Sequence, residues 1–422
     1  MTAQFKYNPY LHWFAAFTAL CTLALIGVGG LVTSHGVGMA VPDWPNTYGY
    51  NMFFFPLSQW VGGVFYEHTH RLVASAVGLL TLLLALWLYG HNARPLMRWL
   101  GAALSLGGII SAVTMPKRWQ DGLVVLLTGV GMLSLSFFWP KVSPTPRWLR
   151  RLGSIAFVAV VLQGVLGGLR VTEHKDEIGI FHATLAQLFF VLVCSIALFT
   201  SRGWATGTLG TRRQDELRPV RRGVLSTLIL TTSLILVQLT LGATMRHEHA
   251  GLAIPDFPLA YGKLWPATDP ASVALYNQRR LEVTALNPIT GSQIVLQMTH
   301  RIVAVAILAA VVFSVVQLVN TFGANNSITK FGYFWVALIL TQAVLGMATI
   351  WSNKAADIAT AHVFGGALSL AVGAILSILS ARALAGPDGT RELSADVAGA
   401  VRPPVGIWLR PQIEDESKRR RT

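Results

Sequence analysis

Ten apolar segments are spaced along this 422-residue chain, and they constrain its fold more than any other feature. Most of them are long enough to cross about 30 Å of hydrocarbon as helices. Inside a bilayer a helix satisfies its own backbone hydrogen bonds, so the sequence predicts an all-α polytopic membrane protein. The first segment is too long for the apolar part of a cleavable signal peptide. The ten predicted spans are 11–33, 64–89, 99–115, 122–140, 152–170, 178–200, 223–245, 293–319, 331–351 and 357–380.

Composition and the placement of charge support this class. The chain is 53% hydrophobic and only 12% charged, as is typical of membrane proteins. Its formal net charge of +14 does not indicate nucleic acid binding, because the charge is sorted by side. If the N-terminus is cytoplasmic and all ten spans cross, cytoplasmic segments carry 22 of the 33 lysines and arginines and the opposite side carries 9. Since positive residues favour the cytoplasmic side, both termini are predicted to be cytoplasmic.

The second half of the chain repeats the first in the same order. Each half contains an apolar helix, a long outer loop, a Thr-His-Arg helix, a Gln-x-Val-Leu-Gly helix and a helix with a histidine near its start. This order predicts two tandem four-helix bundles in parallel repeat. The matching segments are GMAVPDWPNTYG (38–49) and GLAIPDFPLAYG (251–262), THRLVAS (69–75) and THRIVAV (299–305), LQGVLGG (162–168) and LTQAVLGM (340–347), and FHATLAQ (181–187) and AHVFGGA (361–367).

The spacing of the histidines reveals an insertion in the first half. His70 and His182 are 112 residues apart, whereas His300 and His362 are 62 apart. The excess predicts a helical hairpin within about 96–147, although positive residues at its outer turn leave a re-entrant or surface hairpin as an alternative. The predicted parts are an N-terminal repeat at 1–200 with this insertion, a cytoplasmic linker at 201–222, a C-terminal repeat at 223–380 and a basic cytoplasmic tail at 381–422.

Four histidines lie at a similar depth in the predicted bundles. His70, His182, His300 and His362 each lie near the start of a span that runs inward from the outer face, roughly 6–10 Å below that face. A single membrane histidine commonly forms hydrogen bonds between helices. Two imidazoles facing each other across a bundle are also what a haem iron needs for axial ligation. Zinc would need more ligands than the two that each half supplies.

Charged side chains accompany these histidines. Arg71 and Arg301 each follow a histidine directly, where a guanidinium can bind the propionates of a haem or extend to the membrane interface. Glu67 lies three residues before the first of these histidines and on the same helix face, where the second half has Gln297. This carboxylate is suited to proton transfer. The alternative is a structural salt bridge to Arg71 or His68.

In these residues the sequence resembles the haem A synthase family, membrane enzymes that convert haem O to haem A for cytochrome oxidase assembly. The resemblance rests on Glu-x-x-His-Arg at 67–71, PDWP at 42–45, His-Arg at 300–301, His182 and His362. It covers the chain except for the inserted hairpin and the tail. Many members carry a cysteine pair in the first outer loop, and this chain has none there.

The resemblance implies a role for each half. The N-terminal half would bind the substrate haem O and the C-terminal half a resident haem b. Glu67 matches a glutamate that the family requires for function. The implied enzyme is an oxidoreductase that oxidises a methyl group of haem O to a formyl group, with electrons leaving through haem b. The implied axial ligands are His70 and His182 for haem O, and His300 and His362 for haem b.

Location and partners follow from the same resemblance. We expect a multi-pass protein of the bacterial cytoplasmic membrane, with both haem sites toward the outer side, that receives haem O from the enzyme producing it. The sequence does not specify an electron acceptor, and it is compatible with a homo-oligomer. Two other classes stay open: a b-type cytochrome that passes electrons to quinone, and a parallel-repeat transporter. The outer-loop histidines His35, His247 and His249 have no assigned role.

Overall fold

The computed structural model describes residues 6–206, 218–279 and 288–399. Apart from two isolated β-bridges, the regular structure of these residues is helical. Ten of the described helices are long and apolar enough to cross a membrane. The prediction of an all-α polytopic membrane protein is therefore confirmed.

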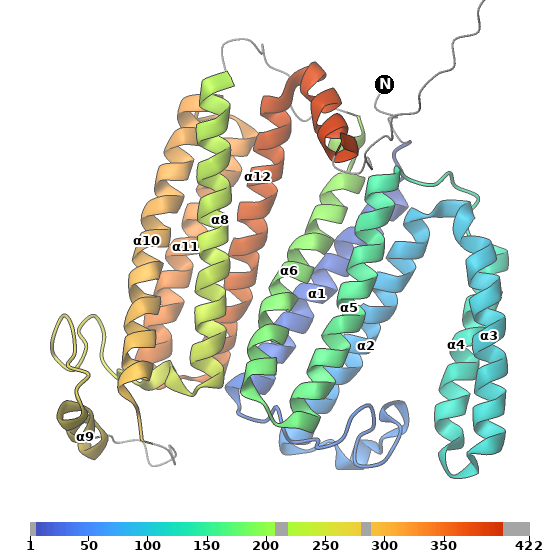
Figure 1. The fold of residues 1–422 in the computed structure, drawn as a ribbon, viewed down its shortest axis with the longest axis horizontal. Coiled ribbons are helices and arrows are strands. Elements are labelled where there is room, and N and C mark those ends of the chain that lie inside the picture. Colours follow the sequence, from blue (N-terminus) through green and yellow to red (C-terminus); the bar gives the residue numbers. More distant parts are fainter. Residues whose placement is uncertain (1–5, 207–217, 280–287, 400–422) are drawn as a thin grey trace, which may run out of the picture.

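Eight of these helices lie in two groups of four (Figure 1). Neighbouring helices within each group pack directly against one another, and each group has its own apolar core. The first group comprises α1 (Pro9–Ser34), α2 (Gly62–Leu88), α5 (Arg147–Glu173) and α6 (Asp176–Thr200). The second comprises α8 (Arg218–His247), α10 (Gly291–Phe322), α11 (Ser327–Trp351) and α12 (Ala356–Gly399).

The two groups contact each other through their central helices. Helix α12 packs against α1 and α6, and α8 also packs against α6. Ala367 and Ala371 of α12 are buried in the core of the first group. The small side chains allow this approach, because close contact between membrane helices favours small residues. The halves therefore share a packed interface, along which α6 and α12 run side by side (Figure 1).

The inserted segment forms a hairpin of two helices, α3 (Ala93–Thr114) and α4 (Trp119–Phe138). The predicted span 99–115 is marginal for crossing, but α3 begins earlier and includes Arg94 and Arg98 in its first turns. A Cβ added to Gly101 would lie 2.7 Å from the backbone nitrogen of Leu133. One added to Gly122 would lie 2.7 Å from the carbonyl oxygen of Gly108. Glycine therefore allows the two backbones to touch.

The hairpin stands to one side of the first group (Figure 1). Near the C-terminal end of α2, Leu86 forms a small buried cluster with Met97 and Trp139. At the opposite end of the hairpin, Asn51 Nδ2 donates to Asp121 Oδ1 over 2.8 Å. The hairpin is therefore attached to the first half at both ends.

Three features depart from the predicted element boundaries. The predicted linker contains a short helix, α7 (Arg202–Ala205), and α12 continues past residue 380 to Gly399. The second outer loop contains an unpredicted helix, α9 (Pro270–Arg279), whose Tyr276 ring stacks on Tyr261 with centroids 3.7 Å apart. Residues 207–217 of the linker and 400–422 of the basic tail lie outside the described residues.

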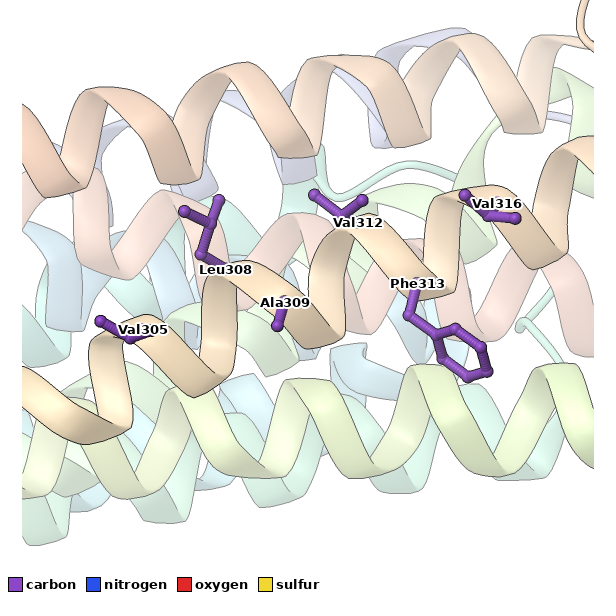
Figure 2. A pocket seen from close by; sticks show the side chains of 6 residues that line it. All are labelled: Val305, Leu308, Ala309, Val312, Phe313 and Val316. Carbon is purple, nitrogen blue, oxygen red and sulfur yellow. The ribbon is translucent and has the colours of Figure 1, made fainter.

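The outward faces of the helices carry large apolar side chains. Figure 2 shows one such face on α10, where six residues line an open groove of about 520 Å³. Val305 is 70% exposed and Phe313 57%. An exposed apolar face of this kind is unfavourable in water and suits lipid chains. Val305 lies five residues after His300, roughly 140° around the helix, so this groove is on a different side of α10 from the histidine. The lining residues are Val305, Leu308, Ala309, Val312, Phe313 and Val316.

Replacing Gly101 with valine should weaken the α3–α4 hairpin. Its side chain would meet the backbone of α4, and overpacking of this kind typically costs about 1–3 kcal/mol. Gly107→Val is the matched control, because nothing lies within 4 Å of a Cβ added there. Thermal unfolding of the two purified variants should show a lower midpoint for Gly101→Val alone. Equal midpoints would contradict the glycine contact.

Candidate functional site

The four predicted histidines form two pairs, one in each half. His70 on α2 and His182 on α6 are close enough to interact electrostatically. His300 on α10 and His362 on α12 are also close enough to interact electrostatically. Each pair comes from two helices of one group, so the halves present equivalent pairs of imidazoles.

Each of the four imidazoles lies against a glycine of another helix in its own half. The pattern is regular: one helix carries the ring and the helix before it in the repeat carries the glycine. A larger residue would place its side chain where the ring lies. The distances from an added glycine Cβ to the ring Cε1 are 3.0 Å for Gly29 and His70, 3.3 Å for Gly167 and His182, 3.4 Å for Gly242 and His300, and 3.4 Å for Gly346 and His362.

The ring nitrogens have an unusual environment. Nδ1 of each of the four histidines is buried and has no hydrogen-bond partner among the described residues. A buried polar atom without a partner is costly and calls for an explanation. The four side chains are only partly buried as a whole. Since Nδ1 is inaccessible and Cε1 faces a glycine, we infer that the accessible edge of each ring is the one that carries Nε2.

Paired imidazoles with accessible Nε2 edges fit a haem iron, which takes one ligand on each face. The described residues contain no group of three or more His, Cys, Asp or Glu side chains that could hold a metal ion directly. The arrangement therefore suits a flat metal-containing ligand inserted between two helices better than a compact metal site.

Glutamines fix the helices that carry these histidines. Gln163 Nε2 on α5 donates to the carbonyl oxygen of His182 over 3.0 Å. Gln238 Nε2 on α8 donates to the carbonyl oxygen of His300 over 2.9 Å. The Gln-x-Val-Leu-Gly motif of the first half thus makes two contacts with His182: Gln163 binds its backbone and Gly167 lies against its ring.

In the first half, Glu67 and Arg71 fasten the outer loop to α2. Glu67 Oε2 accepts from the backbone N–H of Val41 over 2.8 Å, and Oε1 pairs with Arg71 Nη2 over 2.7 Å. The guanidinium also donates to the carbonyl oxygens of Asp43, Asn46 and Val41, at 2.6, 2.8 and 2.9 Å. Both side chains are buried. The salt bridge that the sequence leaves open as an alternative for Glu67 is present.

The second half uses the equivalent positions in the same way. Gln297 Oε1 accepts from the backbone N–H of Ile254 over 2.6 Å. Arg301 donates to the carbonyl oxygens of Asp256 and Leu259, at 2.7 and 3.0 Å, and lies over the ring of Phe257. No hydrogen bond or ion pair joins Gln297 to Arg301 in the described structure. The halves therefore share the loop anchor and differ in its charge.

The PDWP and PDFP segments form matching turns above the histidines. Asp43 accepts from the backbone N–H groups of Tyr48 and Gly49, each over 2.7 Å. Asp256 accepts from the corresponding groups of Tyr261 and Gly262, over 2.7 and 2.9 Å. These turns present the carbonyl oxygens that the two arginines bind, which explains why the loop motif and the His-Arg motif are repeated together.

The three histidines without a predicted role have separate surroundings. His35 stacks on Tyr66 with ring centroids 4.4 Å apart. His247 is buried, with Nδ1 3.7 Å from Asp176 Oδ1 of α6. His249 adopts a left-handed backbone conformation before the second loop. His247 therefore connects the second half to the first.

Several site residues lie outside the sequence predictions. The facing glycines, Gln238, Arg170 and Arg246 each contact or face a histidine pair. Gly167 and Gly346 lie within the repeated Gln-x-Val-Leu-Gly motif, so the repeat could have identified them as site residues. Arg170 and Arg246 each lie at the end of a span and have no charged counterpart in the other half. Comparison of the two halves therefore does not identify them.

The fold and the site define a helical membrane protein of two similar halves, each with a pair of histidines suited to a flat metal-containing ligand. Residues 117–373, more than half of the chain, match the COX15-CtaA family, described as cytochrome oxidase assembly protein. The chain therefore belongs to this family. The matched range contains His182, His300 and His362.

Several proteins named haem A synthase are similar to the chain over much of its length. One from Geobacillus kaustophilus is 22% identical over 398 residues, which cover 92% of this chain and 97% of that protein. One from Methylobacterium radiotolerans is 24% identical over 348 residues, covering 80% and 81%. One from Beijerinckia indica is 29% identical over 250 residues, covering 55% and 62%.

Valine at Gly167 should displace the His182 ring and abolish ligand binding in the first half. A Cβ there already lies 3.3 Å from Cε1 of the ring, and valine adds two methyl groups. Gly164→Val on the same helix is the control, since nothing lies within 4 Å of a Cβ added there. Haem titration of both purified variants, followed by absorbance, should separate them. Normal His70-dependent binding in Gly167→Val would contradict the assigned contact.

Proposed function

We propose that this chain is a haem A synthase, an oxidoreductase that converts a methyl group of haem O to a formyl group. The observation that carries the proposal is the pairing of four imidazoles, two in each half, each against a glycine. Membership of a family of cytochrome oxidase assembly proteins supports it. The names of its relatives support haem A as the product.

In this proposal the two pairs have different ligands. His70 and His182 would hold the substrate haem O, and His300 and His362 would hold a resident haem b. The bound haems supply redox chemistry and a path for electrons. The asymmetry between the charged anchor of the first half and the neutral anchor of the second supports this division.

The protein side chains orient the substrate and enclose it. The glycines leave room for the two imidazoles, and Gln163 fixes the backbone of His182. The loop held by Glu67 and Arg71 covers the outer end of the site. In the proposed reaction Glu67 also holds or moves a proton at its carboxylate oxygens, since it is the ionisable member of the loop anchor.

The proposed location is the bacterial cytoplasmic membrane, with both histidine pairs toward the outer side and both termini in the cytoplasm. The support is the bias of lysine and arginine toward one set of loops. The haem O-producing enzyme as a partner belongs to the same proposal. The sequence also suggested Arg71 and Arg301 as propionate contacts, but their guanidiniums bind loop carbonyl oxygens.

The decisive experiment is haem extraction from cells that express this chain together with a haem O-producing enzyme. Chromatography should resolve haem A, and the purified protein should contain haem b. His300→Ala and His362→Ala should remove the haem b spectrum, because each removes one axial ligand. Haem b without any haem A would favour the b-type cytochrome, and a protein without haem would favour a transporter.

Glu67→Gln should retain the fold and both histidine sites but make little haem A. The amide keeps an oxygen for the Val41 N–H, as Gln297 does for Ile254, and removes both proton transfer and the charge facing Arg71. Loss of proton transfer typically lowers a rate by about 10²–10⁴. Extracted haems and the thermal midpoint should be measured together. Near-normal haem A would contradict the proton-transfer role, and a large fall in the midpoint would favour the salt bridge.

A further inference from the structure

Arg170 lies in the last turn of α5, beside the first histidine pair. Its charge interacts with His70 and His182. Two carboxylates, those of Glu67 and Asp176, also influence it. A guanidinium therefore stands among the polar groups at the outer end of the first site, where the cost of burying its charge requires compensation.

The described structure supplies little of that compensation. No hydrogen bond or ion pair in the described residues involves the Arg170 guanidinium, and its Nε is buried without a partner. Arg71, by contrast, makes three bonds to loop carbonyls and one to Glu67. Arg246, at the contact between the two halves, donates to Thr33 Oγ1 and to Ser34 Oγ. Unlike Arg71 and Arg246, Arg170 therefore has guanidinium donors that bind no described residue.

The surroundings of Arg170 are specific to the first half. A Cβ added to Gly38 would lie 2.6 Å from Arg170 Nη1, so the guanidinium rests against the loop backbone. The neighbouring Gly168 lies under the Trp44 ring. In the repeat, Thr349 stands in the place of Arg170 and Met347 in that of Gly168. The second half therefore has no cation at this position.

We propose that Arg170 binds a carboxylate of the ligand held between His70 and His182. This inference rests on the proposed function, in which that ligand is haem O with its two propionates. A guanidinium matches a carboxylate bidentately, and the bond would occupy donors that the described residues leave unused. The first half thereby recognises the acidic edge of its substrate through α5, while Arg71 is occupied by the loop.

Two porphyrins that differ only at their carboxylates test the proposal. The full-length protein in detergent is titrated with ferric protoporphyrin IX and with its dimethyl ester. Binding to the first site is defined as the absorbance change that His70→Ala removes. Arg170→Met should weaken binding of the free acid about 10- to 100-fold, the range expected for a charge-assisted hydrogen bond. It should leave binding of the ester unchanged.

Three further variants serve as controls. Arg151→Met removes an exposed arginine at the opposite end of α5 and should change neither affinity. Gly38→Ala should push the guanidinium aside and weaken binding of the free acid selectively. Gly251→Ala, the equivalent change in the second loop, should have no effect, because the nearest atom to its Cβ is 3.9 Å away.

The outcomes separate this inference from the function on which it rests. Equal losses for both porphyrins in Arg170→Met would assign Arg170 a structural role and overturn the inference. Unchanged affinities for both would also overturn it, with the first site intact. Absence of any His70-dependent binding in the unaltered protein would instead overturn the proposed function.

Discussion

The outer loops depend on two guanidiniums that bind backbone carbonyl oxygens. A loop at the mouth of a helical bundle has carbonyl groups that no helix satisfies, and unpaired buried groups are costly. Arg71 and Arg301 each donate hydrogen bonds to such carbonyl oxygens, in a turn built on an aspartate. Because each arginine follows a histidine, the helical turn that carries the histidine also holds the loop beside it. The distance between the histidine and its loop is therefore set within a single helix.

The two halves have kept this framework and changed the groups around it. Glu67 and Gln297 accept from equivalent loop N–H groups, but only Glu67 pairs with an arginine. In the first half a tryptophan ring lies on Gly168, whereas the second half has methionine at that position. These substitutions leave the packing of the imidazoles alike and alter the charge at the outer end. The halves thus share the surroundings of the imidazoles and differ in the polar groups beside them.

Hydropathy and repetition were sufficient to predict the ten helices, because each apolar span is continuous in the sequence and the repeated motifs mark equivalent helices in the two halves. The spacing of Glu67 and Arg71 also made their ion pair one of two foreseeable outcomes. The facing glycines were harder to predict, since a glycine receives an imidazole only when two helices have a particular rotation and depth. Helix α9 lies in a polar loop and has no counterpart in the first half, so neither hydropathy nor the repeat predicted it. Arg170 was not predicted as a site residue, because its neighbours come from other segments of the chain.

The contact between the halves brings the two sites into one polar region. Arg246 of α8 donates to Thr33 and Ser34 of α1, and its charge also acts on His362. The adjacent His247 faces Asp176 at the start of α6 and interacts with His182. Two consecutive residues of one helix thus face both histidine pairs. Close packing and hydrogen bonds between helices both stabilise contacts in a membrane. These polar contacts therefore act together with the packing of Ala367 and Ala371 to hold the second half against the first, and with it the relative position of the two sites.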